Sequence, residues 1–392
     1  MAAAVHAGAS LPAYSTAGIL AGRVPAMADF TSALYLGLQH PSATLPGWSA
    51  LTLGRPAALE EPPGACAVAT ELAALQGCEA ATLLPSTLHL FWDLFGILGR
   101  QGATIYVEAT TYAIARWGVQ HGEALGAPVH RFTFGDAAGL ERLMRRGANC
   151  RGRPLIVCDA VRPGSDRQSP LARYASLAAQ YGGCLVLDDT QALGVLGYGA
   201  RAGAPMGFGG GGSLRHQALG GAHIIVGASL AKGFGVPVAA LSGSRAMVRL
   251  FEERSQTRIH ASPPSAAAIH AAGQALALNR RCGDALRLRL VQRVRRFRQR
   301  LAQWYLRATG GDFPVQSLAA VPGIDAASLH AGLLQRRVRT VLHRDARGAT
   351  LSFILTATHS AGCIDRAVTA LAQTVHALSG GRRAGATFLE TS

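Results

Sequence analysis

The stretch Ala228-Ser229-Leu230-Ala231-Lys232-Gly233-Phe234-Gly235 places one lysine in a glycine-containing turn between two apolar segments. Residues 223–227 (HIIVG) lead into the turn and residues 236–241 leave it, and both have the apolar character of buried strands. Because an apolar setting disfavours the ammonium form, it lowers the pKa of a lysine and leaves the amine nucleophilic. The stretch therefore predicts that Lys232 forms a Schiff base with an aldehyde cofactor, and a solvated surface lysine is the alternative on this motif alone.

An acidic residue upstream strengthens this interpretation. In Leu185-Val186-Leu187-Asp188-Asp189, the apolar run predicts a buried strand that ends at Asp188. Ligands of open α/β sheets bind beyond the carboxyl ends of the strands. We therefore expect Asp188 and Lys232 at the same edge of one sheet.

The remaining apolar segments predict an α/β protein. Predicted strands alternate with predicted helices over residues 80–187, as in a mainly parallel sheet with helices on its faces. The 392 residues, 49% of them hydrophobic, are enough for a large core. A glycine-rich segment, residues 207–212, lacks the flanking elements of a dinucleotide fingerprint and is predicted to be a mobile loop. The expected divisions are an N-terminal arm (1–45), a large domain (46–275), and a helix linker with a small C-terminal domain (276–392).

The turn Ser86-Thr87-Leu88 is a candidate phosphate site. It follows a predicted strand, residues 80–84, and precedes a predicted helix. The free N–H groups at the start of a helix can hold a phosphate. An ordinary capped helix is the alternative.

The chain is strongly basic, with a formal net charge of +16. Its densest cluster, residues 287–300, has the pattern of a helix with an arginine-rich outer face. No recognised nucleic-acid motif accompanies it, so nucleic acid is not an expected partner. A solvated helix face is the simplest interpretation, and attraction of an anionic substrate such as a coenzyme A thioester is the alternative.

Seven cysteines are scattered singly along the chain, without a C-x-x-C pair. This pattern predicts reduced thiols in a cytoplasmic protein, with neither disulfides nor a metal site. Residues 1–22 lack the basic start and continuous apolar run of a signal peptide. No segment predicts a membrane span, and no membrane partner is expected.

Five segments, in the same order, resemble motifs of the α-oxoamine synthases, a group of fold-type-I enzymes that use pyridoxal phosphate (PLP). These enzymes join an amino acid to an acyl-coenzyme A thioester, usually with loss of carbon dioxide. The resemblance implies a large domain with a mainly parallel mixed sheet, a small C-terminal α/β domain, and a homodimer with its active site at the interface. The segments are Phe30-Thr31-Ser32 with Tyr35-Leu36-Gly37-Leu38, Asp188 to Gly197, Ser229 to Gly235, Ser262 to Ala267, and Thr356 to Ser360 with Ile364-Asp365.

The resemblance also implies roles for single residues. Lys232 would hold the cofactor as a Schiff base and move the Cα proton, and Asp188 would pair with the pyridinium nitrogen. Tyr112 stands where the family has a ring-stacking histidine, and it can replace that residue because stacking needs only a flat ring. A core aromatic side chain at a helix start is the alternative for Tyr112. The other cofactor ligands implied in this way are Ser86, Thr87, Leu88, Asp159, Gln191, Ser229 and His260.

Several positions depart from the family pattern. Gln191 replaces a histidine, and it can hydrogen-bond the cofactor's phenolic oxygen but cannot act as an acid or base. Ser352 stands where an arginine binds the substrate carboxylate, so that clamp is missing. His260 replaces a small hydroxyl residue and is either a phosphate contact or a buried polar side chain. Arg162 occupies a position near the cofactor in relatives, with a surface arginine as the alternative. The candidate substrate-binding arginines are Arg162, Arg344 and Arg347.

We therefore predict a PLP-dependent transferase of specialised metabolism. An amino-acid-like donor would form a Cα carbanion that attacks an acyl-coenzyme A or acyl-carrier thioester. The alternative is other PLP chemistry on the same scaffold (aminotransferase, decarboxylase, or Cβ or Cγ bond formation), which the lost histidine and arginine favour. A binding or regulatory protein is disfavoured because Lys232 and Asp188 are both present.

Overall fold

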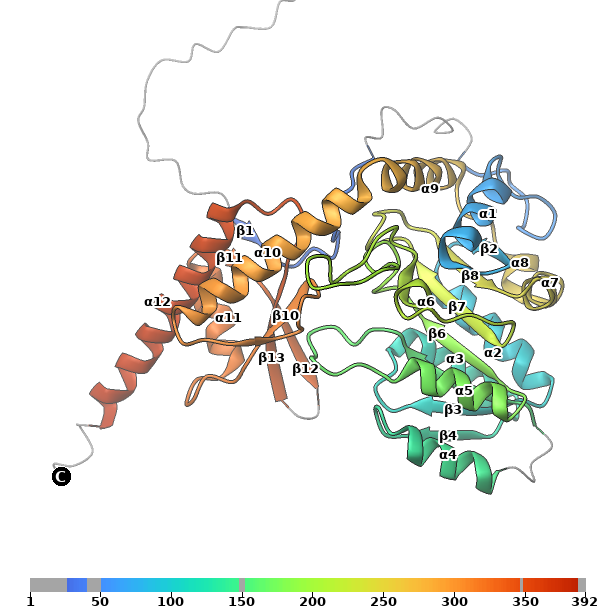
Figure 1. Ribbon diagram of the computed structural model, residues 1–392, viewed down its shortest axis with the longest axis horizontal. Helices are drawn as coiled ribbons and strands as arrows, with labels where there is room; N and C mark the ends of the chain where they lie inside the picture. Colours follow the sequence, from blue (N-terminus) through green and yellow to red (C-terminus); the bar gives the residue numbers. More distant parts are fainter. Residues whose placement is uncertain (1–26, 41–50, 148–151, 346–347, 387–392) are drawn as a thin grey trace, which may run out of the picture.

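The computed structural model describes residues 27–40, 51–147, 152–345 and 348–386. Two α/β lobes lie side by side, and a long helical segment joins them (Figure 1). Within the described residues, no helix is both long enough and apolar enough to cross a membrane.

A seven-stranded sheet forms the larger lobe. One strand, β8, runs opposite to the other six and pairs antiparallel with β2 and β7, so the predicted mainly parallel mixed sheet is confirmed. In spatial order the strands are β2 (Ala80–Leu84), β8 (Ala239–Gly243), β7 (Ile224–Ser229), β6 (Cys184–Asp188), β5 (Pro154–Asp159), β3 (Thr104–Glu108) and β4 (Val129–Phe132).

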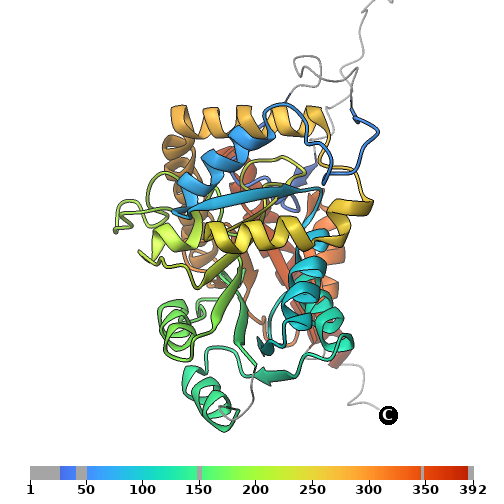
Figure 2. The same ribbon diagram turned by 90° about the vertical axis from the view of Figure 1, so that its right-hand side faces the viewer.

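Helices cover both faces of this sheet (Figure 2). Successive side chains of a strand point to opposite faces, so strands that are apolar throughout need a cover on each side. On β5, Leu155 and Val157 join the core beneath α2 and α3, whereas Ile156 and Cys158 join the core beneath α4 and α5. The helices of this lobe are α1 (Ala65–Gln76), α2 (Thr87–Arg100), α3 (Ala113–Ala124), α4 (Ala137–Arg146), α5 (Leu171–Gln180), α6 (Gly212–His216), α7 (Arg245–Arg254), α8 (Gln256–His260) and α9 (Ala266–Leu278).

The smaller lobe is built on a four-stranded antiparallel sheet. One face carries Leu351 and Phe353, which pack with helix residues such as Phe297 and Leu371. The opposite face turns toward the large lobe. The elements are α10 (Asp284–Ala302), β9 (Ala308–Thr309), β10 (Val315–Leu318), α11 (Ala326–Gln335), β12 (Val341–Asp345), β13 (Gly348–Ile354) and α12 (Ala361–Ala386).

The described part of the N-terminal segment crosses from one lobe to the other. β1 (Ala28–Asp29) pairs in parallel with β11 (Val338–Arg339) of the small lobe. A few residues later His40 Nε2 lies 3.0 Å from the carbonyl oxygen of Phe234, beside the Lys232 turn. The segment therefore brings Tyr35, which lies between these contacts, to the junction of the two lobes.

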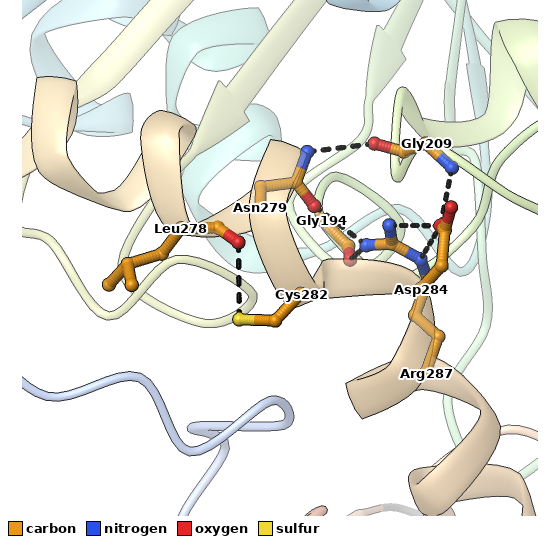
Figure 3. Close-up of polar contacts among 7 residues, drawn as sticks. All are labelled: Gly194, Gly209, Leu278, Asn279, Cys282, Asp284 and Arg287. Atoms are coloured by element: carbon orange, nitrogen blue, oxygen red, sulfur yellow. Dashed lines mark hydrogen bonds and ion pairs between the residues drawn. The ribbon is translucent and has the colours of Figure 1, made fainter.

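The glycine-rich segment 207–212 is held in place, so its prediction as a mobile loop is wrong. Arg287, 1% exposed, donates to the Gly194 carbonyl (2.9 Å) and to Asn279 Oδ1 (2.8 Å), and it pairs with Asp284. Asp284 in turn accepts the Gly209 N–H, and the Asn279 amide donates to the Gly209 carbonyl (2.8 Å each; Figure 3). A π-helical turn, η3 (Asn279–Gly283), joins α9 to α10 at this point, so the network ties the helical connection between the lobes to the large domain.

Candidate active site

A cavity of about 1050 Å³ lies between the carboxyl-terminal edge of the large sheet and the open face of the small sheet. Lys232, Asp188 and Asp159 line it from the large lobe, and Ser317 and Ser352 line it from the small lobe. The structure thus brings Asp188 and Lys232 to the same edge, where the carboxyl ends of parallel strands were expected to form a site.

Lys232 sits in the turn that follows β7. This turn packs so closely on its neighbour that a Cβ atom added to Gly233 would lie 2.3 Å from the Leu193 carbonyl oxygen. Burial lowers the pKa of Lys232, against the opposing effect of Asp188 and Asp159. The amine therefore loses its proton more readily than that of an exposed lysine, which is the direction that the sequence predicted. Lys232 is also the only lysine in the sequence, a signal that we did not use in predicting its role.

Two carboxylates face this amine from adjacent strands. The β5–β6 register places Asp159 directly opposite Asp188. Burial and the neighbouring Asp188 raise the pKa of Asp159 to about 8, although the backbone N–H of Tyr112 donates to both of its oxygens (3.1 and 3.0 Å). Burial also raises the pKa of Asp188, against a hydrogen bond from the Thr190 N–H (3.0 Å). Lys232 is a cation that favours the ionised form of both acids.

The start of α2 also borders the cavity. Its N-cap residue, Ser86, makes no side-chain hydrogen bond to the helix backbone; its Oγ lies 2.8 Å from His89 Nδ1 instead. The first N–H groups of α2 therefore keep their capacity to donate to a bound anion. Thr87 and Ser229 line the cavity beside them.

Tyr112 and Gln191 complete the large-lobe wall. Tyr112 is the N-cap residue of α3, and its side chain is 62% exposed, so the alternative of a core aromatic residue does not hold within this chain. Gln191 Oε1 accepts a 2.5 Å hydrogen bond from the hydroxyl of buried Tyr35, which leaves the amide nitrogen of Gln191 free to donate. Tyr35 also lines the cavity but was not predicted as a site residue.

Comparisons with known proteins agree with this geometry. Residues 168–371 match the family model described as aminotransferase class I and II. The 8-amino-7-oxononanoate synthase of Acidithiobacillus ferrooxidans is 33% identical over 323 residues, which cover 79% of this chain and 77% of that protein. A putative 8-amino-7-oxononanoate synthase of Bordetella bronchiseptica is 31% identical over 319 residues, covering 78% and 75% of the two chains.

Solved structures show the same fold. A serine palmitoyltransferase from Sphingomonas wittichii has a TM-score of 0.72 at 16% identity, covering 90% of this chain and 88% of that one. The 8-amino-7-oxononanoate synthase of Francisella tularensis has a TM-score of 0.69 at 18% identity, covering 90% and 98%.

The chain belongs to the α-oxoamine synthases, within the aminotransferase class I and II family. It is a PLP-dependent transferase of fold type I, which confirms the predicted family, fold class and cofactor.

The cavity of this α-oxoamine synthase has chemical groups that fit PLP. The amine of Lys232 suits the cofactor's aldehyde. The paired acids Asp159 and Asp188, both of which burial disfavours as anions, suit a cationic ring nitrogen. The free N–H groups at the start of α2 suit its phosphate.

Three predicted ligands of this α-oxoamine synthase do not line the cavity. The Leu88 side chain is 41% exposed, and Ser86 lies at the helix start without facing the cavity. His260, the last residue of α8, is exposed, so it is not the buried polar side chain that one alternative required. The other alternative, that His260 contacts the cofactor phosphate, stays a prediction. His260 does not line the cavity of this chain, so the structure does not support that role.

Of the two predicted substrate-binding arginines that lie in the described residues, the structure brings one to the cavity. Arg162 lines the cavity. On β12, His343 lines the cavity opposite Thr350, so its neighbour Arg344, paired with Ala349, lies on the other face of the sheet. The structure therefore does not bring Arg344 to the cavity. Arg347 lies outside the described residues.

Hydroxyl groups occupy the small-lobe wall where the missing arginine would stand. Ser352 is fully buried, and its Oγ lies 2.9 Å from Ser317 Oγ. The pairing of the two hydroxyls satisfies both side chains without a cation. The small-lobe side of the synthase cavity is consequently polar but, apart from His343, carries no titratable base among its described lining residues.

We expect the cofactor-free protein to lose thermal stability as the pH rises from about 6.5 to about 8.5. Burial raises the pKa of Asp159 to about 8 and that of Asp189 to about 7. Below these values the folded chain still holds protons that the unfolded chain has lost from about pH 4 upward, so the free energy of unfolding falls as the pH rises and levels off above about 8. Scanning calorimetry should therefore show a lower Tm at the higher pH.

Asp189→Asn provides the matched comparison for this prediction. Asp189 is 1% exposed and accepts the Ser213 N–H (3.2 Å), so the amide removes the titration but keeps an acceptor. Burial lowers the pKa of Lys232, and this shift makes the free energy of unfolding rise with pH. The effect is the same in wild type and in Asp189→Asn, so it cancels in the comparison. The fall in Tm should be smaller in Asp189→Asn, and an equal or larger fall would contradict the assignment.

Proposed function

We propose that this enzyme joins an amino-acid-like donor to an acyl thioester by carbon–carbon bond formation. The observation that carries the proposal is the single lysine amine facing two buried acids in one cavity. The cavity volume, about 1050 Å³, is at the upper end of ordinary ligand sites, which leaves room for a second substrate beside the cofactor and donor. The names of the relatives support the same reaction class.

PLP, when bound, supplies an electron-accepting ring that makes the Cα–H bond of an amino acid acidic. Lys232 would hold the cofactor through its aldehyde and would move the proton at the donor Cα, a role that its lowered pKa suits. Asp188 would favour a cationic ring nitrogen by offering a buried carboxylate. The Gln191 amide would donate to the phenolic oxygen, and Tyr112 would offer a flat ring for stacking.

An absorbance titration tests this function. We would load the purified protein with PLP, add amino acids one at a time, and then add acyl-coenzyme A thioesters while following release of the free thiol. Thiol release that depends on one amino acid supports the proposal. Exchange of an amine with a keto acid, without thiol release, would contradict it and indicate an aminotransferase.

We further propose that the enzyme is a homodimer and that its partner covers the outer surface of α2 and α3. Several large apolar side chains are exposed there: Leu88 (41%), Trp92 (42%), Tyr112 (62%) and Trp117 (49%). Such a concentration of exposed apolar side chains is typical of an interface.

Light scattering should give the mass of a dimer for the wild-type protein and a shift toward monomer for Trp92→Glu. Trp304→Glu, which changes an equally exposed residue beyond α10, is the control and should keep the dimer. A wild-type monomer at micromolar concentration would contradict the proposal, as would equal masses for the two variants.

We also propose the domain division 1–45, 46–275 and 276–392, because the helical connection between the lobes passes from α9 to α10 near its second boundary. A cytoplasmic location is proposed because the six described cysteines are all unpaired. An acyl carrier protein remains a candidate source of the thioester beside coenzyme A.

A further inference from the structure

Two arginines of the cavity wall have no ionic partner. Arg162 and Arg167 both line the cavity, and their guanidinium carbons lie 4.8 and 5.8 Å from the centre of the Phe134 ring. None of the ion pairs found in the described residues includes either of them. Two like charges on one aromatic ring repel each other, and an anion bound between them would relieve that repulsion.

The loop that carries these arginines is braced against the small lobe. Asp166 Oδ1 accepts the N–H groups of Gly310 and Gly311 (2.8 and 2.9 Å). The Thr309 hydroxyl donates to the Gly164 carbonyl (2.7 Å), and a Cβ at Gly164 would lie 2.1 Å from Ser317 Oγ. Figure 1 shows this loop, between β5 and α5, reaching from the large lobe toward the small sheet. Within the described residues, no ion pair joins Asp166 to either arginine.

One buried acid, Glu108, binds both the segment that carries Phe134 and the end of the arginine loop at Ser169. Glu108, 1% exposed, accepts the Gly135 N–H (3.0 Å) and the Ser169 hydroxyl (2.8 Å). The two chain segments that carry the ring and the arginines are therefore anchored to one buried side chain. Anchoring of the backbone lowers the ordering cost of binding an anion there.

The sheet order separates these cations from the reacting centre. Lys232 follows β7, Asp159 ends β5 and Phe134 follows β4. The Lys232 amine faces Asp159 and Asp188, at the ends of β5 and β6. From β5 to β4 there are two strand spacings, or about 10 Å at the usual interval between strands. A single carbon separates the α-carboxylate of an amino acid from its nitrogen, so that carboxylate must lie near Lys232. Arginines that lie against Phe134 are better placed for the far end of a longer ligand.

We propose that Arg162 and Arg167 bind an anionic group of the acyl partner, at its end remote from the thioester carbonyl. This inference rests on the proposed function, because it needs an acyl thioester as second substrate. The anion is either a phosphate of a coenzyme-A-type carrier or a terminal carboxylate of the acyl chain. Both groups accept the paired N–H donors of a guanidinium.

Calorimetric binding to the PLP-loaded protein tests the inference with two pairs of probes. 4′-Phosphopantetheine and pantetheine differ in one phosphate, and S-glutaryl- and S-pentanoyl-pantetheine differ in a terminal carboxylate. In one pair the anionic probe should bind wild type about 10- to 100-fold more tightly than its neutral counterpart. That pair identifies the source of the anion.

The preference should disappear in the double variant Arg162→Gln/Arg167→Gln, while neutral probes bind as in wild type. Arg145→Gln on α4, which removes a charge outside the cavity lining, is the control and should keep the preference. Absence of a preference in wild type, or its survival in the double variant, would overturn the inference. So would a double variant whose absorbance response to amino acids is lost, because the arginines would then serve the donor carboxylate. A wild type without any absorbance response to amino acids would instead count against the proposed function.

Discussion

Lys232→Ala should lose the visible absorbance that PLP confers on the wild-type protein, and turnover should fall by at least about a hundred- to ten-thousandfold, the usual contribution of one proton-transfer group. The alanine removes both the amine that holds the aldehyde and the base that moves the donor's Cα proton. Because Lys232 is the only lysine in the sequence, no neighbouring lysine can replace it. The measurement is an absorbance spectrum of the loaded protein together with thiol release from the acyl thioester.

Lys232→Arg is the matched control for this substitution. Arginine keeps a positive charge beside Asp188 and Asp159 but stays protonated, so it can neither form a Schiff base nor act as a base. We expect the two variants to be equally inactive. Turnover within about tenfold of wild type in either variant would contradict the role of the amine, because the loss would be smaller than the usual rate contribution of one proton-transfer group.

Asp188→Asn should reduce turnover by about a hundred- to a thousandfold, as removal of one well-placed electrostatic group does in other enzymes. The amide has the same shape and can still accept the Thr190 N–H, but it carries no charge to keep the ring nitrogen of the cofactor cationic. The carbanion at Cα would lose the electron-accepting character of the ring. Steady-state kinetics should show the loss mainly in kcat.

Asp189→Asn separates this effect from simple loss of a buried acid. Asp189 is the next residue in the chain and is also buried (1% exposed, against 8% for Asp188), yet it does not line the cavity. We expect its amide variant to keep turnover close to wild type. If both variants lost the same activity, the result would indicate a structural role for Asp188 instead of an electrostatic one.

The central part of the site was predictable from the sequence because its residues follow buried strands. Asp188 and Lys232 come directly after apolar runs, and the carboxyl ends of parallel strands meet at one edge. A strand–turn–helix pattern likewise indicated Thr87, whereas Asp159 and Ser229 were implied only by the resemblance to the α-oxoamine synthases. A count of lysines would have identified Lys232 without any motif.

Other features depend on contacts between distant segments and left little trace in the sequence. Tyr35 reaches Gln191 only because the N-terminal segment pairs with the small lobe. β9 has two residues and β10 has four, too few to show an alternating pattern. The glycine-rich segment resembles a free loop in sequence but is bonded at Gly209 by Asp284 and Asn279. Both of these side chains are in turn bonded to Arg287, a buried arginine that the helical pattern placed among solvated ones.

The lining of the small lobe explains why the prediction of the arginines was only partly successful. The direction of Arg344 depends on the register of β12 against β13, which sequence reasoning did not establish. The pairing of Ser317 with Ser352 joins two strands that are far apart in the chain. The bracing of the Arg162 loop by Gly310 and Gly311 likewise exists only in the folded protein.

Borohydride reduction of the PLP-loaded protein, followed by mass spectrometry of its peptides, tests the central claim most directly. Reduction makes a Schiff base between the cofactor and an amine permanent, and the sequence offers one lysine for it. We predict one pyridoxyl group per chain, located on the peptide that contains Lys232 and absent from Lys232→Ala. A reduced protein without the modification on that peptide would contradict the account.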